Sequence, residues 1–135
     1  MSAAKRGYTC LFLNKFFYDH GDTLIIDNTR HGAQEDISIL CDIFTKFKFE
    51  TKNFVDLTKD KILGQLDALL KKRSVLELHD AFVAIFSSHG NTSLIYDKYC
   101  NELPIDKIME RFSNENCPGL AHKPKILIFL CCRGG

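Results

Sequence analysis

Residues 80–90 read DAFVAIFSSHG, and residues 125–135 read KILIFLCCRGG. Each stretch is an apolar run that ends in small or polar residues, which is typical of a strand buried on both faces of a parallel sheet. In open α/β sheets, ligands bind beyond the carboxyl ends of the strands. The pattern therefore predicts that His89 and a thiol, from Cys131 or Cys132, come to the same edge of one sheet.

The rest of the chain alternates between strand-like and helix-like segments. Strands are expected at 8–13 and 49–57, helices at 33–47, after an N-cap at Thr58 and from Pro104 onward, and a small hairpin at TSLIY and KYCNEL. Ile62, Leu66, Leu69 and Leu70 are expected to face inward from the second helix. This order indicates an α/β fold with a mostly parallel sheet and helices on both faces. Residues 14–32 form a long loop, and such loops are usually functional.

Composition indicates one ordinary globular domain. Apolar residues make up 45% and charged residues 26% of the 135 residues, and the formal net charge is +1. This balance argues against nucleic acid or a membrane surface as a partner. We find no signal-like or membrane-spanning apolar run, so a cytoplasmic location is expected.

The six cysteines lie mostly within apolar runs. In a reducing compartment they are expected to be buried thiols rather than disulfides. The chain has no Cys-x-x-Cys pair and no clustered Cys/His spacing, so neither a metal site nor another cofactor is expected.

A histidine close to a cysteine suits nucleophilic chemistry, because the thiolate is the reactive form and an adjacent imidazolium stabilises it. The two strands would have to be neighbours, roughly 5 Å apart, or separated by one further strand. Alternation along a strand points Cys131 and Cys132 in opposite directions. The pattern alone leaves open which of the two faces solvent. By itself, His89 would more often be a turn residue, and Cys132 would more often be an inert core residue.

Several stretches, in the right order, resemble the large subunit of the caspase family. KPKILIFLCCRGG and the upstream SSHG resemble the segments that carry the nucleophile and the histidine in that family. KRGYTCLFLN resembles its first strand, NTRHGAQEDISILCDIF its Arg-x-Gly-x-x-x-Asp segment, and KNFVDLTKDKI its second strand and helix. The resemblance covers nearly the whole chain and implies a caspase-like three-layer sandwich completed by a separate small subunit.

The resemblance implies a catalytic role for three positions. Cys132 would be the nucleophile, and His89, 43 residues earlier, the general acid/base. The backbone N–H groups of Gly90 and Cys132 would form the oxyanion hole.

Three further positions would bind substrate. Arg30 would line the pocket for the substrate's aspartate side chain through a charge-assisted pair. Leu130 stands where the family often has glutamine, which removes one polar partner of that aspartate, and Ser88 lies beside the catalytic histidine.

Two classes of function remain after this comparison. The first is a cysteine endopeptidase that cleaves proteins after aspartate in apoptosis or related signalling. The second is a weakly active or inactive homologue that binds and regulates an active caspase. In either case residues 1–135 would be the catalytic large-subunit half, paired with a small subunit in a dimer of large/small heterodimers. An unrelated flavodoxin-like binding module is disfavoured because no Gly-rich phosphate loop follows a strand.

Overall fold

A computed structural model describes residues 7–72 and 76–133 of the chain, with residues 131–133 described by their backbone alone. A six-stranded sheet forms its centre. Its strands run in the order β2 (Phe49–Val55), β1 (Gly7–Leu13), β3 (Ala81–Gly90), β4 (Leu94–Tyr96) and β5 (Glu102–Pro104), and β6 (Lys125–Arg133) pairs with β3. Strands β2, β1, β3 and β6 are parallel, whereas β4 and β5 form an antiparallel hairpin.

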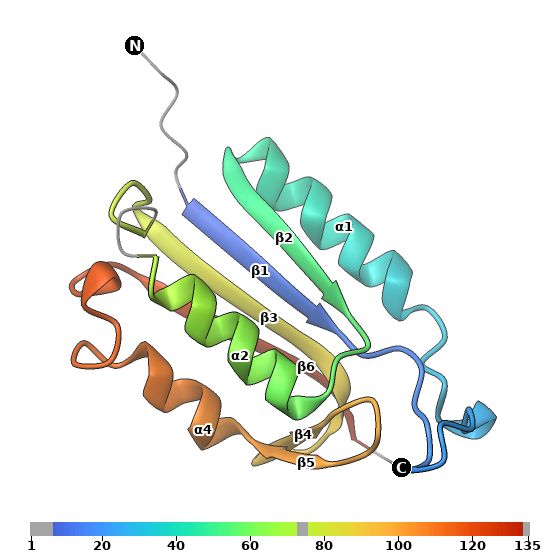
Figure 1. Ribbon diagram of the computed structural model, residues 1–135. Coiled ribbons are helices and arrows are strands. Elements are labelled where there is room, and N and C mark those ends of the chain that lie inside the picture. The colour runs from blue at the N-terminus through green and yellow to red at the C-terminus, as the bar shows by residue number, and fades with distance from the viewer. Residues whose placement is uncertain (1–6, 73–75, 134–135) are drawn as a thin grey trace.

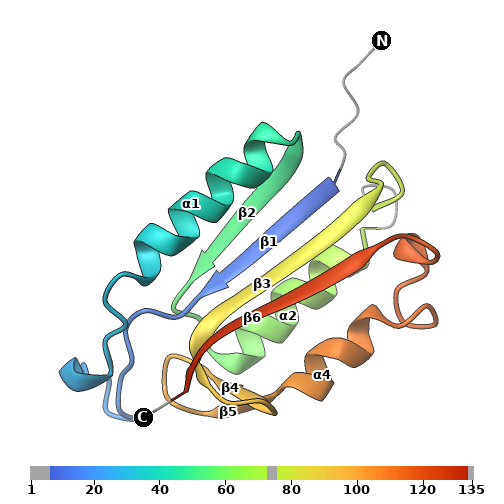
Figure 2. The same ribbon diagram turned by 180° about the vertical axis from the view of Figure 1, so that it is seen from behind.

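Helices cover both faces of the sheet (Figures 1 and 2). Helix α1 (Ala33–Lys46) lies on one face, and α2 (Lys59–Leu70) and α4 (Ile105–Met109) lie on the other. Three short 3₁₀ turns complete the described elements: η1 (Ile26–Asn28), η2 (Glu110–Phe112) and η3 (Pro118–Leu120). The predicted α/β fold with a mostly parallel sheet between helices is confirmed.

Local sequence explains where the two longer helices begin. In α2, the hydroxyl of Thr58 accepts a hydrogen bond from the Lys61 N–H at 3.2 Å, so the predicted N-cap is confirmed. The four residues expected to face inward from this helix are all buried. Helix α1 places Glu35 and Asp36 in its first turn, where the helix dipole favours acids.

A row of stacked aromatic rings crosses the four parallel strands on the α2 side. Phe54, Phe12, Phe86 and Phe129 are consecutive partners in the register, with ring centroids 4.9, 5.1 and 5.1 Å apart. Because a slip of one residue would turn each ring to the opposite face, this row specifies how β6 aligns with β3. The same alignment determines which residues meet at the carboxyl ends of these strands.

Several predicted boundaries were wrong. Strand β2 ends at Val55 because Asp56 adopts a left-handed conformation with φ of 51°. The helix expected at 33–47 ends at Lys46, and Phe47 after it is 61% exposed where the chain turns toward β2. In the hairpin, residues 98–101, expected to begin the second strand, lie in the turn before β5.

One face of the sheet is only partly covered. Helix α1 lies over the β2 side, and within residues 7–72 and 76–133 no helix covers β6 on this face (Figure 2). Ile126 and Leu130 of β6 are 49% and 37% exposed, although strands of parallel sheets are normally buried on both faces. In the described part of the chain, β6 pairs with β3 alone, so its other edge is unpaired. The described helices include none long and apolar enough to span a membrane.

Candidate active site

The predicted histidine and cysteine positions meet at the carboxyl ends of β3 and β6. In the register, His89 is the direct partner of Cys132, Ser88 of Cys131 and Gly90 of Arg133. Neighbouring strands lie about 4.8 Å apart, so the two backbones are adjacent at this point. The side chain of Cys132 lies outside the part of the chain that the structure describes.

The imidazole of His89 is held between a carbonyl oxygen and an aromatic ring. Its Nε2 atom lies 2.7 Å from the backbone oxygen of Asn28, and the Phe17 ring centroid lies 4.7 Å from the imidazole centroid. A carbonyl oxygen can only accept a hydrogen bond, so the neutral ring carries its proton on Nε2. That tautomer leaves Nδ1 as the nitrogen able to take up a proton.

The loop between β1 and α1 supplies both of these contacts. Its first residues are held by Asp56, whose carboxylate accepts from the N–H groups of Lys15 and Phe16 at 2.7 and 3.1 Å. Its last part returns to the same place, because the Arg30 N–H donates to the Lys15 oxygen at 3.0 Å. The loop is therefore fastened at both ends to the carboxyl edge of the sheet.

Arg30 points its guanidinium into this edge. Nη1 donates to the Asn14 oxygen at 3.1 Å and to the Ser87 hydroxyl at 2.8 Å, and Nη2 donates to the Leu130 oxygen at 3.4 Å. The Nε atom is buried and has no acceptor within the described residues. Its N–H is therefore unpaired among the described residues. A guanidinium edge with two N–H groups matches a carboxylate.

Gly90 and Ser88 have different surroundings. A Cβ atom on Gly90 would lie 2.4 Å from the Leu94 oxygen, so the close approach of β4 requires glycine here. Ser88 is 1% exposed; its hydroxyl donates to the Tyr96 oxygen at 2.6 Å and accepts from the Asn14 amide at 3.3 Å. These contacts of Ser88 are all within the protein, so its contact with substrate is still only a prediction.

Sequence reasoning missed Asn14, Phe17, Asn28 and Ser87. Asn14 and Ser87 could have been found, because both lie at or just beyond the carboxyl end of a predicted strand. Asn28 acts through its backbone oxygen, so its side-chain type carried no signal.

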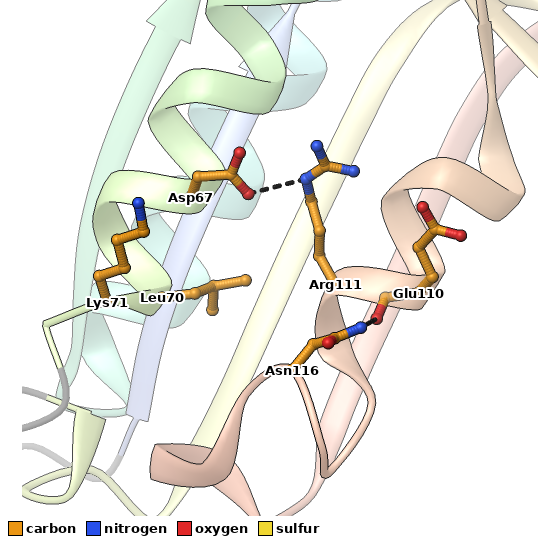
Figure 3. A pocket seen from close by; sticks show the side chains of 6 residues that line it. All are labelled: Asp67, Leu70, Lys71, Glu110, Arg111 and Asn116. Atoms are coloured by element: carbon orange, nitrogen blue, oxygen red, sulfur yellow. Dashed lines mark hydrogen bonds and ion pairs between the residues drawn. The ribbon is translucent and has the colours of Figure 1, made fainter.

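A pocket of about 300 Å³ lies elsewhere, in the layer of α2 and η2 (Figure 3). It is lined by Asp67, Leu70, Lys71, Glu110, Arg111 and Asn116. Arg111 Nε donates to the Asp67 carboxylate at 2.8 Å across it. Its lining holds no cysteine, histidine or serine and comes from the α2 and η2 layer rather than the carboxyl ends of β3 and β6, so it is not part of the carboxyl-edge site.

The protein is thus a three-layer α/β domain. A histidine, a cysteine position and a partly unpaired arginine lie together at the carboxyl ends of its parallel strands. The family model Peptidase_C14, described as the caspase domain, matches residues 8–135. The chain belongs to the caspase domain family.

Curated relatives and a solved structure agree with this assignment. Caspase-6 of Gallus gallus is 31% identical over 134 residues, which is 99% of this chain and 42% of the relative. Caspase-3 of Felis catus is 32% identical over 108 residues, 78% of this chain and 37% of the relative. The crystal structure of the Drosophila initiator caspase Dronc superposes with a TM-score of 0.82 at 23% identity, covering 95% of this chain and 49% of that one. The predicted caspase-like fold is confirmed, and the chain spans less than half the length of these relatives.

Proposed function

We propose that residues 1–135 are the catalytic large-subunit half of a cysteine endopeptidase, with Cys132 as nucleophile and His89 as general acid/base. The observation that carries the proposal is the direct pairing of these two positions in neighbouring parallel strands. Membership of the caspase domain family supports the same chemistry.

The orientation of the imidazole suggests how the proton would move. The Cys132 thiolate attacks the scissile carbonyl carbon and forms a C–S bond. Since Nε2 of His89 is engaged by the Asn28 oxygen, Nδ1 carries the proton that passes to the leaving amine as the C–N bond breaks. Water then hydrolyses the thioester, with Nδ1 as base. The N–H groups of Gly90 and Cys132 are proposed to stabilise the oxyanion.

The substrate side chain proposed for this site is aspartate. The buried Nε of Arg30, without an acceptor among the described residues, supports a carboxylate ligand beside it. Leu130 borders the guanidinium through its backbone oxygen and has a half-exposed side chain, so this position gives an aspartate no polar side-chain partner. The preference for aspartate over uncharged residues then depends mainly on Arg30.

The partner proposed for the chain is a caspase small subunit. Its support is the partly exposed β6, which has an unpaired edge in the described residues and apolar side chains open on the α1 face. A strand of the partner would pair with that edge and further partner elements would cover that face, giving a large/small heterodimer and then a dimer of heterodimers. Cleavage of proteins in apoptosis or related signalling completes the proposal.

The test is hydrolysis of a fluorogenic peptide by the chain in complex with its small subunit. We expect turnover of a peptide ending in aspartate and roughly tenfold to over 100-fold less of the matched peptide ending in asparagine, because a charge-assisted pair is lost. Cys132→Ala and His89→Gln should each abolish detectable turnover. Equal turnover by the wild type and Cys132→Ala would contradict the proposal.

A second candidate is a homologue that binds and regulates an active caspase. The observation that favours it is Leu130, an apolar side chain at the position beside Arg30. No turnover, together with no labelling of Cys132 by an aspartyl ketone, would favour this second function. In that case we expect the chain to change the activity of an added active caspase.

A further inference from the structure

Asp97 is a fully buried carboxylate, with 0% of the residue exposed. Its Oδ1 accepts from the N–H groups of Tyr99 and Asn101 at 2.9 and 2.8 Å. Its Oδ2 accepts from the Lys59 N–H at 2.8 Å and from the Asn101 amide at 3.3 Å. All four donors are uncharged, and Lys59 is the first residue of α2, where the helix dipole favours an anion. Asp97 thus ties the turn of residues 97–101 to the start of α2.

This turn also holds the loop between β1 and α1. The Lys98 oxygen accepts from the Tyr18 N–H at 2.7 Å, and the Tyr99 hydroxyl donates to the Asp22 carboxylate. The Lys98 ammonium lies 5.2 and 5.1 Å from the ring centroids of Tyr18 and Tyr99. The loop is therefore fastened to the turn by backbone, side-chain and cation–π contacts.

The residue before the buried carboxylate reaches the catalytic edge from the other side. The Tyr96 oxygen accepts from the Ser88 hydroxyl at 2.6 Å and from the Asn14 amide at 3.0 Å. Ser88 directly precedes His89, and the oxygen of Asn14 accepts from Nη1 of Arg30 at 3.1 Å. If Tyr96 and Asp97 shifted, the bonds of the Tyr96 oxygen would displace Ser88, which precedes His89, and Asn14, whose oxygen accepts from Arg30.

We propose that Asp97 is a positioning residue for His89 and Arg30, an inference that rests on the proposed function of that pair. The loop that the turn holds carries Phe17 and the oxygen of Asn28, which are the two contacts that orient the imidazole. Asp97 acts through them and touches no reacting atom. Without its carboxylate, the part of the loop between its two fastened ends loses its fixed attachment to the turn, and the oxygen that accepts the Nε2 proton of His89 becomes less fixed.

The experiment is ¹⁵N NMR of the histidine-labelled protein, which reports the tautomer of His89. The wild type should show the Nε2–H form. Asp97→Asn keeps the shape of the side chain but turns an amide group toward an N–H donor, so we expect the Nδ1–H form to appear beside it. The matched control is Asp67→Asn, the same change at a carboxylate on α2 that lies 44% exposed in the distant pocket.

Tyr99→Phe provides a second variant that should fold normally, because it removes an exposed hydroxyl and keeps the ring. We expect the same change in tautomer, smaller in size, and a fall in kcat of at least roughly tenfold for Asp97→Asn with the small subunit bound, since small misplacements of catalytic groups are costly. A wild-type tautomer in both variants, or in Tyr99→Phe if Asp97→Asn does not fold, would overturn the inference.

The two proposals can fail separately. An inactive wild type whose His89 tautomer responds to Asp97→Asn would refute the proposed function and support the positioning role. An active wild type whose tautomer does not respond would refute the positioning role alone.

Discussion

Arg30 is held by three oxygen acceptors without any substrate: those of Asn14, Ser87 and Leu130. Together these bonds fix the plane of the guanidinium. A planar group fixed in this way loses little conformational freedom when a carboxylate binds. The same residue therefore contributes to stability and to the proposed specificity, and experiments must separate the two.

Arg30→Lys should lower kcat/KM for a peptide ending in aspartate by roughly 100-fold, because an ammonium lacks the planar edge of two N–H groups that pairs with a carboxylate while other N–H groups bond Asn14 and Ser87. The thermal midpoint should fall as well, since the buried Ser87 hydroxyl loses a donor. The informative quantity is the ratio of kcat/KM for aspartate and asparagine peptides, which a purely structural loss would leave unchanged.

Leu130→Gln should act in the opposite direction. A glutamine amide would add one hydrogen bond to the substrate carboxylate, worth about 1.5–3 kcal/mol, so kcat/KM for aspartate peptides should rise roughly tenfold to over 100-fold. Leu130→Met is the control, because it has similar size and no amide. An equal gain in both variants would show that packing, and not hydrogen bonding, limits the site.

At the scale of residues, the sequence predicted which residue types come to the sheet edge but not their contacts. His89 and Arg30 were identified from their segments, whereas Asn28 and Asp97 were not. The bond from Arg30 to Leu130 spans 100 positions along the chain, and local periodicity contains no information about such a pairing. The burial of Asp97 likewise depends on where α2 begins relative to the hairpin.

At the scale of elements, β1 is the strand whose residues are all buried. Cys10 lies at its centre with 0% exposed, and burial raises the pKa of its thiol to about 12. Elements were predicted well here because a continuous apolar run is a strong signal. Register was not predictable, since it follows from the aromatic row of Phe54, Phe12, Phe86 and Phe129, which forms only when four strands assemble.

The raised pKa of Cys10 gives β1 a measurable dependence on pH. Below about pH 9 the thiol is protonated in both the folded and the unfolded chain, so it contributes no pH dependence. Between about pH 9 and 12 only the unfolded chain ionises it, and the free energy of unfolding should fall by about 1.4 kcal/mol per pH unit from this group.

Denaturant unfolding between pH 8 and 11 would measure this slope. Cys10→Ala should be less stable than the wild type at all pH values. Above about pH 9, however, its free energy of unfolding should fall less steeply with pH, by about 1.4 kcal/mol per pH unit. Identical slopes for Cys10→Ala and the wild type would contradict the expected burial of this thiol.

At the scale of the whole molecule, the partly covered α1 face is the main departure from a self-contained α/β domain. The sequence resemblance predicted a sandwich completed by a separate small subunit, and within the described residues β6 has exposed apolar side chains and an unpaired edge. The sequence could not predict which side chains of β6 are exposed to solvent, because their exposure depends on α1 lying over β2 (Figure 2).

Ile126→Asp should weaken binding of the small subunit by at least roughly tenfold, because a half-exposed apolar side chain would become a charge in an apolar interface. Met109→Asp is the control, since Met109 is 51% exposed and ends α4, which covers the opposite face of the sheet. Isothermal titration calorimetry with the isolated partner would measure both affinities. Equal weakening by the two variants would exclude the α1 face as the binding surface.

The most direct test of the catalytic pair is the rate at which an aspartyl ketone modifies Cys132, followed by mass spectrometry in the complex with the small subunit. The account predicts selective modification of Cys132 among the six cysteines, and a rate at least roughly 100-fold lower in His89→Gln. Modification of Cys132 at the same rate with and without His89 would contradict it.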